Sequence, residues 1–542
     1  MSDESPSQLK HNHRQLRSLR LSLGCLRHTA SRTIDRWITP LAANPDSQTL
    51  CVLTHDVLLR TLRRQMSYVP RRIKGLGRQV VAAIALIGIF SLTLGCEYVR
   101  PTMNAPLAMW DPAYGYRSTN LPPSKTGSSD SLFIVASFSG GGTRASTLAY
   151  GVLRELARTQ IVWEGQRKRL LDELNIINAL SGGSFTAAYY ALYGDRIFDD
   201  FETRFLRKNW ESELRARIFR SPINWFRMWS PFFGRAHIFS ELLDEALFEG
   251  HTFGDLMAHP RRPMIFIHAS DMASLSRFEF NQRQFDLICS DLNQLPLSVA
   301  TAASSALPLL LSPISMTNYA GQCGYMLPLQ LQELRKTSWG RLRATQLRAY
   351  LDAKKRPYIY LLDGGLSDNI GMREVLENTA FYGDIESTFV SLGTKQIRKL
   401  VYLMVSAETS PDPDQYILNE IPGLMRVSRA LVDIPINRYS TDTLEFMKQS
   451  VEQWRAQLLQ RPQGVDSAFT PDADIYIINA SFTEMEDLQE QARLMNIPTN
   501  LALNGEQVDH LLQAGAQLLR NDKEFQRLMR DLAEEAAVHP SP

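Results

Sequence analysis

Apolar runs alternate with helical patterns from about residue 131 to the end of the chain. The runs are SLFIVASF (131–138), LNIINAL (174–180), MIFIHAS (264–270), YIYLLD (358–363), LVYLMVS (400–406) and DIYIINASF (474–482). Helical spacing of apolar residues follows the first run, as far as Leu156, and the second, from Phe185 to Leu192. Segments 420–462 and 505–535 read as amphipathic helices that close the domain. Strands buried on both faces that alternate with helices predict an α/β fold with a mostly parallel sheet.

Charge is distributed unevenly along the 542 residues. Residues 1–78 contain 14 Lys and Arg against five Asp and Glu, a balance of +9, so the net charge of +2 leaves −7 for the remainder. A nucleic-acid-binding protein is expected to carry its basic surplus on the folded domain. The distribution therefore argues against a nucleic-acid partner.

An uncharged stretch, VVAAIALIGIFSLTLGC (80–96), follows a cluster of basic residues. It is short for a membrane-spanning helix, which needs roughly 20 residues, and is typical of a signal-peptide core. Its end, Leu92 to Cys96, resembles the lipobox of bacterial lipoproteins, although Thr93 stands where Leu is usual. We interpret 66–96 as a signal peptide starting at Met66, or as a membrane anchor, with Cys96 lipidated and the protein in the cell envelope. An uncleaved transmembrane helix and a merely buried helix stay open.

The flanking segments follow from this interpretation. Residues 1–65, which begin at the other possible start, Met1, form an upstream extension to which we assign no fold. The Pro- and Ser-rich residues 97–130 are expected to be a linker. Downstream of Cys96 only Cys289 and Cys323 remain. They form either one disulfide, which an oxidising compartment permits, or two separate buried thiols.

The first candidate site is the loop Ser139 to Ala145, SGGGTRA, between a strand and a helix. Gly140, Gly141 and Gly142 expose successive amides at a helix N-terminus, which suits a phosphate or the oxyanion of an acyl-transfer intermediate. The spacing also fits a dinucleotide fingerprint, but that reading needs an acid at the end of the next strand, where the sequence is ALS. This absence argues against a nucleotide.

The second candidate is Ser181, in ALSGGSF between a strand and a helix. A Ser followed by Gly182 and Gly183 on such a turn exposes its hydroxyl above a parallel sheet. Ala179 occupies the first Gly position of the G-x-S-x-G pattern, and Ala is the smallest replacement. Ser184 is a rival nucleophile, better placed to cap the helix. The alternative is a glycine-rich turn with a solvated Ser.

A serine nucleophile needs a base. Three histidines are candidates for this role, and none of them occupies a position in the sequence that clearly suits it. His268 follows a strand and cannot be dismissed, His510 lies in a helical pattern, and His539 lies in a Pro-flanked tail.

Asp363 is the better candidate, because it follows an apolar run and precedes Gly364 and Gly365. We expect its strand to deliver it to the same sheet edge as Ser181, where it can accept the hydroxyl proton. Asp363 could instead cap a helix, a role that also suits Asp368.

SGGGTRA, ALSGGSF and DGGLSDNIG, in this order, resemble the three motifs of the patatin-like phospholipase family, and 298–314 resembles the segment between its Ser and Asp. The resemblance covers about 131–525 and also extends to the cytosolic phospholipase A2 group. It implies a three-layer α/β/α sandwich that cleaves fatty-acyl esters of lipids with a Ser181–Asp363 dyad, without metal or cofactor. The Gly140–Gly142 amides would form the oxyanion hole, and Arg144 would anchor the loop or a phosphate. Gly182, Gly183, Gly364 and Gly365 would support the motifs.

Within the expected acyl hydrolase domain, 131–535, residues 201–262 form a cap insert. From Arg204 to Arg235 it carries eight Lys and Arg against two Glu, interleaved with aromatic residues. This composition suits a membrane interface; a packed cap or a protein partner are the alternatives. We expect a phospholipase A or lysophospholipase type of lipid acyl hydrolase that acts on a membrane surface. A non-catalytic lipid-binding lipoprotein and an acyltransferase with the same dyad are the other hypotheses.

Overall fold

The computed structural model describes residues 100–117, 129–258, 263–328, 338–409, 421–460 and 467–538. The N-terminal extension 1–65, the signal or anchor segment 66–96 with Cys96, and His539 lie outside these residues. Among the described residues, none of the helices combines the length and apolar character needed to span a bilayer.

The centre of the domain is an eight-stranded mixed sheet with the order β12-β11-β2-β5-β6-β10-β9, and with β7 paired to β6. Five neighbouring strands are parallel: β12 (Phe469–Ser481), β11 (Ile397–Ser406), β2 (Leu132–Phe138), β5 (Leu174–Leu180) and β6 (Met264–Asp271). Three are antiparallel to their neighbours: β7 (Ser276–Glu279), β10 (Tyr358–Leu362) and β9 (Ile314–Thr317). The α/β class is confirmed, and the sheet is mixed where a mostly parallel one was expected.

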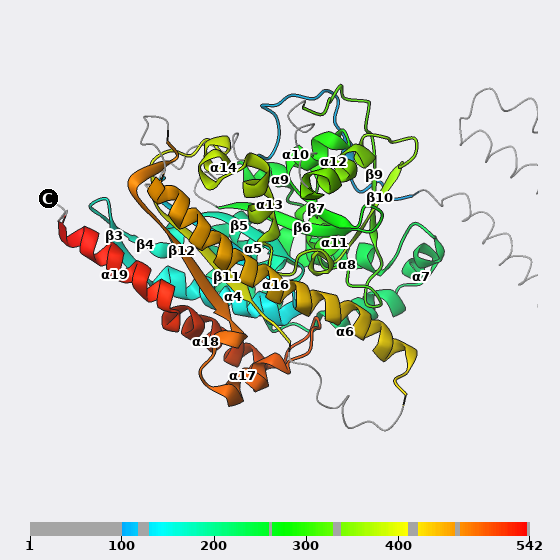
Figure 1. The fold of residues 1–542 in the computed structure, drawn as a ribbon. Helices are drawn as coiled ribbons and strands as arrows, with labels where there is room; N and C mark the ends of the chain where they lie inside the picture. Colours follow the sequence, from blue (N-terminus) through cyan, green and yellow to red (C-terminus); the bar gives the residue numbers. More distant parts are fainter. Residues whose placement is uncertain are drawn as a thin grey trace, which may run out of the picture. The chain divides into compact units, whose positions relative to one another are not determined.

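Helices cover both faces of this sheet, and the alternation of side chains along each strand separates two cores (Figure 1). On one face, Leu132 and Ile134 pack with α4 (Gly142–Arg158), α5 (Gly182–Tyr193), α18 (Gly505–Asn521) and α19 (Lys523–Val538). On the other, Phe133 and Val135 pack with α13 (Arg373–Tyr382), α14 (Ile385–Ser391) and α16 (Leu424–Gln460). Because both faces are buried, the central strands read as continuous apolar runs.

The direction of β10 differs from the expectation. It runs antiparallel to β6, with Leu361 opposite Asp271 and Leu362 opposite Ser270. β6 extends three residues beyond His268, which pairs with the last residue of β5, Leu180. β10 runs back along this extension, so its end still arrives beside the end of β5. The two motifs therefore lie close together as expected, although β10 is antiparallel to β6 and not parallel to it.

Part of the segment that we expected to be a linker packs against the domain. β1 (Ala105–Pro106) pairs with β8 (Ser290–Asp291), and Arg117 forms an ion pair of 3.1 Å with Asp286. Cys289 and Cys323 form a disulfide next to this segment. The polar and Pro-rich composition of the segment gave no sign of these contacts, because they form with residues such as Asp291, far along the chain.

The insert between β5 and β6 is helical and is packed onto α5 and α11 (Leu297–Ser304). It contains a helical segment Ile197–Leu206, α6 (Trp210–Phe219), α7 (Pro222–Trp229), α8 (Arg235–Leu243) and α9 (Phe253–Leu256). The remaining described strands and α-helices are β3 (Gln160–Trp163), β4 (Gln166–Arg169), α10 (Gln282–Leu287), α12 (Ser338–Tyr350) and α17 (Leu488–Met495).

Candidate active site

Ser181 lies on the sharp turn between β5 and α5. Its backbone has φ 46° and ψ −123°, a conformation that a residue with a Cβ adopts only under strain. The turn directs the hydroxyl toward the β10 end, where Ser181 Oγ donates a hydrogen bond of 2.7 Å to Asp363 Oδ2. Both residues are buried, with 5% and 4% of their surface exposed. Two side chains 182 residues apart in the sequence therefore meet at one sheet edge.

The Asp363 carboxylate is held on both sides. Its second oxygen, Oδ1, accepts the Gly365 amide at 2.8 Å, and its own amide donates to Ala306 O at 3.1 Å. Burial raises the pKa of Asp363 to about 6, against the opposing effect of the hydrogen bonds from Ser181 and Gly365. A carboxylate with this pKa is mostly ionised at pH 7 yet more basic than an ordinary Asp, which suits a general base.

The backbone of Ser181 is fixed by a residue that the sequence did not single out. Ser304 Oγ, at the end of α11, accepts the Ser181 amide at 2.7 Å and donates to His268 O at 2.6 Å. Ser304 lies in a Ser- and Ala-rich helix without a motif of its own, so only its spatial position identifies it. Ser184 Oγ donates to Ser181 O at 2.6 Å, and no described side chain accepts the first amides of α5, so the expected capping role of Ser184 is wrong.

The glycine loop lies directly beside this turn. A Cβ added to Gly140 would come within 3.3 Å of Ser181 Cβ, and one added to Gly182 would collide with the carbonyl oxygen of Gly142. The Gly140 amide donates to Asn369 O at 3.3 Å. No bond to another described residue engages the amides of Gly141 and Gly142. These two N–H groups are the ones left to receive an oxyanion.

Arg144 is buried behind the loop. Its guanidinium donates to the main-chain oxygens of Ala407, at 2.9 Å, and Ile497, and to Thr499 Oγ1 at 3.1 Å. These bonds tie the start of α4 to the ends of distant segments, as an anchor does. Asp368 accepts the amides of Gly371 and Arg373, both at 2.9 Å, and so caps the turn before α13.

The histidines do not join the Ser–Asp pair. His268 is fully buried, and burial holds its pKa well below the usual range. Its ring nitrogens form no hydrogen bond with any described residue. His510 pairs with Glu490 at 2.8 Å on α18. Neither of these two histidines is therefore bonded to the Ser–Asp pair.

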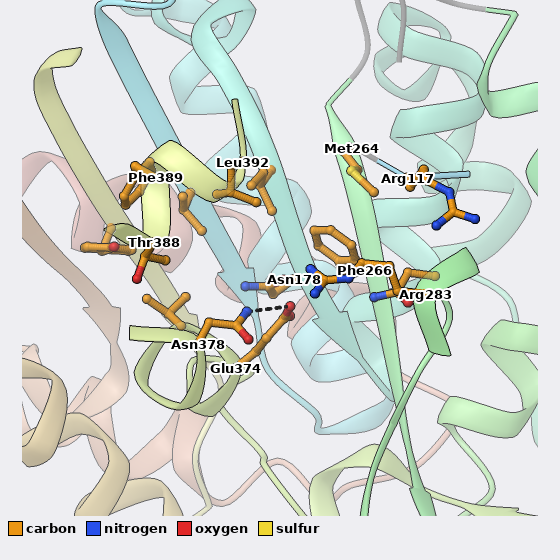
Figure 2. Close-up of a pocket in the computed structure, with 15 residues that line it drawn as sticks. Arg117, Asn178, Met264, Phe266, Arg283, Glu374, Asn378, Thr388, Phe389 and Leu392 are labelled. Carbon is orange, nitrogen blue, oxygen red and sulfur yellow. Dashed lines mark hydrogen bonds between the residues drawn. The ribbon is translucent and has the colours of Figure 1, made fainter. Parts of the chain in front are cut away.

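A cavity of about 80 Å³ lies elsewhere, between the sheet and α13 and α14 (Figure 2). Its lining includes Asn178, Phe266, Glu374 and Tyr402, and does not include Ser181 or Asp363. It opens on the opposite face of the sheet from α4 and α5, so it belongs to a different region from the Ser–Asp pair.

Residues 136–376 match the family model described as patatin-like phospholipase. Among solved structures, human GIVD cytosolic phospholipase A2 aligns over 75% of this chain and 63% of its own length, with 11% identity and a TM-score of 0.42. The same enzyme in complex with methyl gamma-linolenyl fluorophosphonate aligns over 74% of this chain and 59% of its own length, with 14% identity and a TM-score of 0.35. VipD from Legionella pneumophila aligns over 77% of this chain and 71% of its own length, with 12% identity and a TM-score of 0.24. The chain thus spans less than two thirds of the human phospholipase. No curated protein matches the sequence.

Proposed function

We propose, from the premise that this chain carries a patatin-like phospholipase domain over residues 136–376, that it is a lipid acyl hydrolase. The substrate class is a phospholipid, a lysophospholipid or another fatty-acyl ester. The observation that carries the proposal is the 2.7 Å hydrogen bond from Ser181 Oγ to the buried Asp363 carboxylate. A strained serine turn next to unoccupied main-chain donors supports it.

The reaction proceeds through an acyl-enzyme. Asp363 accepts the Ser181 proton as Oγ attacks the ester carbonyl carbon, and the amides of Gly141 and Gly142 stabilise the oxyanion. The tetrahedral intermediate collapses, the C–O bond to the alcohol breaks, and Asp363 returns the proton to the leaving oxygen. Water then attacks the acyl-enzyme while Asp363 takes its proton. Collapse of this second intermediate releases the fatty acid, and the proton returns to Ser181.

The first test is Ser181→Ala in the purified protein, assayed against phospholipids, lysolipids, neutral lipids and a short soluble ester. We expect the rate of fatty-acid release to fall by about 10⁴-fold or more, and fluorophosphonate labelling to disappear. Ser184→Ala, three residues away, is the matched control and should stay labelled. Equal labelling of Ser181→Ala and wild type would reject the mechanism. Acyl transfer to added alcohols in place of free fatty acid would favour the acyltransferase.

We also propose that α7 contacts a lipid surface. Its Trp225 and Trp229 are 49% and 71% exposed, and Ile223 beside them is exposed as well. Five of the eight basic residues from Arg204 to Arg235 form ion pairs with acidic side chains: Arg204, Arg207, Arg215, Arg217 and Arg227. The apolar face of α7, more than positive charge, therefore supports this proposal. Trp210 is buried in the core and takes no part.

The double substitution of Trp225 and Trp229 by Ala should weaken binding to phospholipid vesicles several-fold, because both rings lose their apolar contact with the interface. Sedimentation with vesicles measures this loss, and hydrolysis of a short soluble ester should stay within twofold of wild type. Leu459→Ala, which removes an exposed apolar side chain from α16, is the control. Unchanged vesicle binding of the double variant would reject α7 as the contact.

Attachment to an envelope membrane through Cys96 stays a proposal from the sequence. Its support is the uncharged stretch 80–96 behind a basic flank. Incorporation of a labelled fatty acid that is lost in Cys96→Ser would support it, and equal incorporation would reject it.

A further inference from the structure

A second group of buried polar side chains lies on the face of the sheet that α13 covers. His268 projects from β6, Glu279 from the end of β7 and Glu374 from the first turn of α13. One ligand atom from each lies within 4.8 Å of the others, and His268 Nε2 is 3.7 Å from Glu374 Oε2. His268 and Glu279 are buried, and the Glu374 side chain is 13% exposed. None of the three motifs accounts for this histidine–carboxylate cluster, which consists of His268, Glu279 and Glu374.

The cluster presents buried atoms that the described residues leave without hydrogen bonds. They are both ring nitrogens of His268, Oε2 of Glu374 and, on the neighbouring strand, Oδ1 of Asn178. A neutral imidazole has one nitrogen lone pair to share, and an ionised carboxylate and an amide oxygen only accept. Native proteins rarely bury such groups unpaired. A positively charged ligand would satisfy the nitrogen lone pair and the oxygens together. Burial and the facing Glu279 carboxyl raise the pKa of Glu374, so a cation that binds here would displace a proton from this pair of glutamates.

The other oxygens of the two carboxylates are held in place by amides. Asn378 Nδ2 donates to Glu374 Oε1 at 3.3 Å, and Asn281 Nδ2 donates to Glu279 Oε1. Figure 2 shows the bond between Asn378 and Glu374 at the edge of the cavity. Outer hydrogen bonds of this kind orient the carboxylates of metal sites.

The cavity next to the cluster has room for further ligands. Glu374 and Asn178 line it, and its volume of about 80 Å³ exceeds the roughly 15 Å³ that one water needs on the same scale. A cation held by three protein groups can therefore complete its coordination with water.

We propose that His268, Glu279 and Glu374 bind one divalent transition-metal cation, with Zn²⁺ the best match. One imidazole nitrogen and two carboxylate oxygens suit zinc better than magnesium or calcium, which prefer ligand sets made of oxygen alone. Metal–ligand distances near 2.1 Å place tetrahedral ligand atoms about 3.4 Å apart. The 3.7 Å between His268 and Glu374 is close to this value, and the wider gaps close by inward movement of about 1 Å.

Neighbouring arginines should lower the affinity of the cluster for a cation, but Arg277 directs its ion pair away from it. Arg277, Arg283 and Arg343 all act electrostatically on Glu279. Arg277 forms its ion pair, of 3.1 Å, with Glu377, outside the cluster. We therefore expect weaker zinc binding than in a site of the same ligands without cationic neighbours.

The bound cation would join segments that carry the Ser–Asp pair without touching it. Glu374 lies in the first turn of α13, the helix that follows the Asp363 loop. The main-chain oxygen of His268 accepts the Ser304 hydroxyl, which in turn holds the Ser181 amide. The role is thus structural, and the proposal stands or fails independently of the proposed hydrolase activity.

The experiment uses the full chain, treated with chelator and dialysed, and titrated with Zn²⁺ by calorimetry. We expect one Zn²⁺ per chain and an increase in melting temperature when zinc is present, with no such effect of Mg²⁺. Glu374→Gln and His268→Gln should each weaken zinc binding by at least about tenfold. Glu155→Gln removes a buried, ion-paired carboxylate from α4 and should bind as wild type.

Two results would overturn the proposal: a wild-type chain that binds no zinc, or zinc binding that survives unchanged in both cluster variants. If a variant fails to fold, X-ray absorption spectroscopy of the zinc-loaded wild type identifies the ligand atoms and so tests the site. Nitrogen and oxygen ligands that include imidazole support the site, and sulfur in the coordination shell rejects it.

Discussion

Two regions adjoin β6: the proposed catalytic edge, where Ser181 meets Asp363, and the histidine–carboxylate cluster. Their hydrogen bonding differs. At the catalytic edge each Asp363 carboxylate oxygen accepts a hydrogen bond, and the Ser181 amide and hydroxyl each have a partner. In the cluster, both nitrogens of His268 and one oxygen of Glu374 lack partners among the described residues. In the first region the polar groups have partners within the fold, whereas in the second we propose that a ligand supplies them.

The two regions also differ in how the chain builds them. The catalytic edge depends on strained or glycine-rich turns, with Ser181 at φ 46° and Gly142 at φ 61°. The cluster uses ordinary positions on two strands and a helix. Strained turns need particular residues in a row and so leave a local motif, whereas side chains on regular elements leave none. A candidate catalytic site can thus be found from sequence when an equally buried cluster cannot.

The largest effect that separates the two regions is expected from Asp363→Asn. An amide cannot accept the Ser181 proton, so kcat/KM should fall by about 10⁴-fold, measured with a short soluble ester. His510→Ala, which removes a histidine that pairs with Glu490, is the control and should change the rate little. A rate for Asp363→Asn within tenfold of wild type would mean that another group is the base.

Gly182→Ala tests whether the catalytic edge depends on close contact between its two loops. The added methyl group would collide with Gly142 O, so the loops must separate. A shift of about 1 Å at the reacting groups costs roughly 100-fold in rate. Gly423→Ala adds a methyl group with nothing within 4 Å and should leave rate and melting temperature unchanged. Wild-type activity in Gly182→Ala would show that the loops have freedom that the structure does not suggest.

The pH dependence follows from the pKa of Asp363, which burial raises from 3.8 to about 6. The base is lost on protonation, so kcat/KM should fall about tenfold for each pH unit below 6. Stability changes in the opposite sense. The native state holds this proton more tightly than the unfolded chain, so its contribution is fully present below pH 3.8 and is lost as pH rises through 6.

This loss amounts to roughly 3 kcal/mol at neutral pH. Asp363→Asn has no charge to bury, so thermal unfolding at pH 8 should show a melting temperature equal to or above that of wild type. A clearly lower melting temperature would indicate that the carboxylate stabilises the fold.

Removal of metal should give the smallest change in rate, and it tests whether the cluster acts separately from the Ser–Asp pair. Treatment of the wild type with chelator should lower the melting temperature by a few degrees, because a ligand that binds only the folded state stabilises it. Ester hydrolysis at 25 °C should change less than threefold, since the Ser–Asp pair does not touch the cluster. A loss of rate comparable to that of Ser181→Ala would show that the cluster takes part in hydrolysis, contrary to our proposal that the two regions are separate.

The pattern of apolar residues was enough to predict the order and extent of the main elements. The expected strand at 174–180 coincides with β5, and the helices expected at 420–462 and 505–535 appear as α16, and as α18 and α19. Local periodicity carries this information because burial on one or both faces constrains each short segment. The Ser181 and Asp363 motifs were visible for a related reason, since their turns demand glycine next to the reactive residue.

How these elements meet depends on contacts that form in the folded domain. The antiparallel direction of β10, the hydrogen bonds of Ser304, the disulfide between Cys289 and Cys323 and the packing of residues 103–117 all depend on partners far along the chain. An apolar run has the same pattern whichever way its strand points, and a buried His beside a distant Glu has no local signature. Strand direction and long-range pairing are stabilised by contacts between elements. Those contacts form only when the elements pack together, so they leave no pattern in a short segment of sequence.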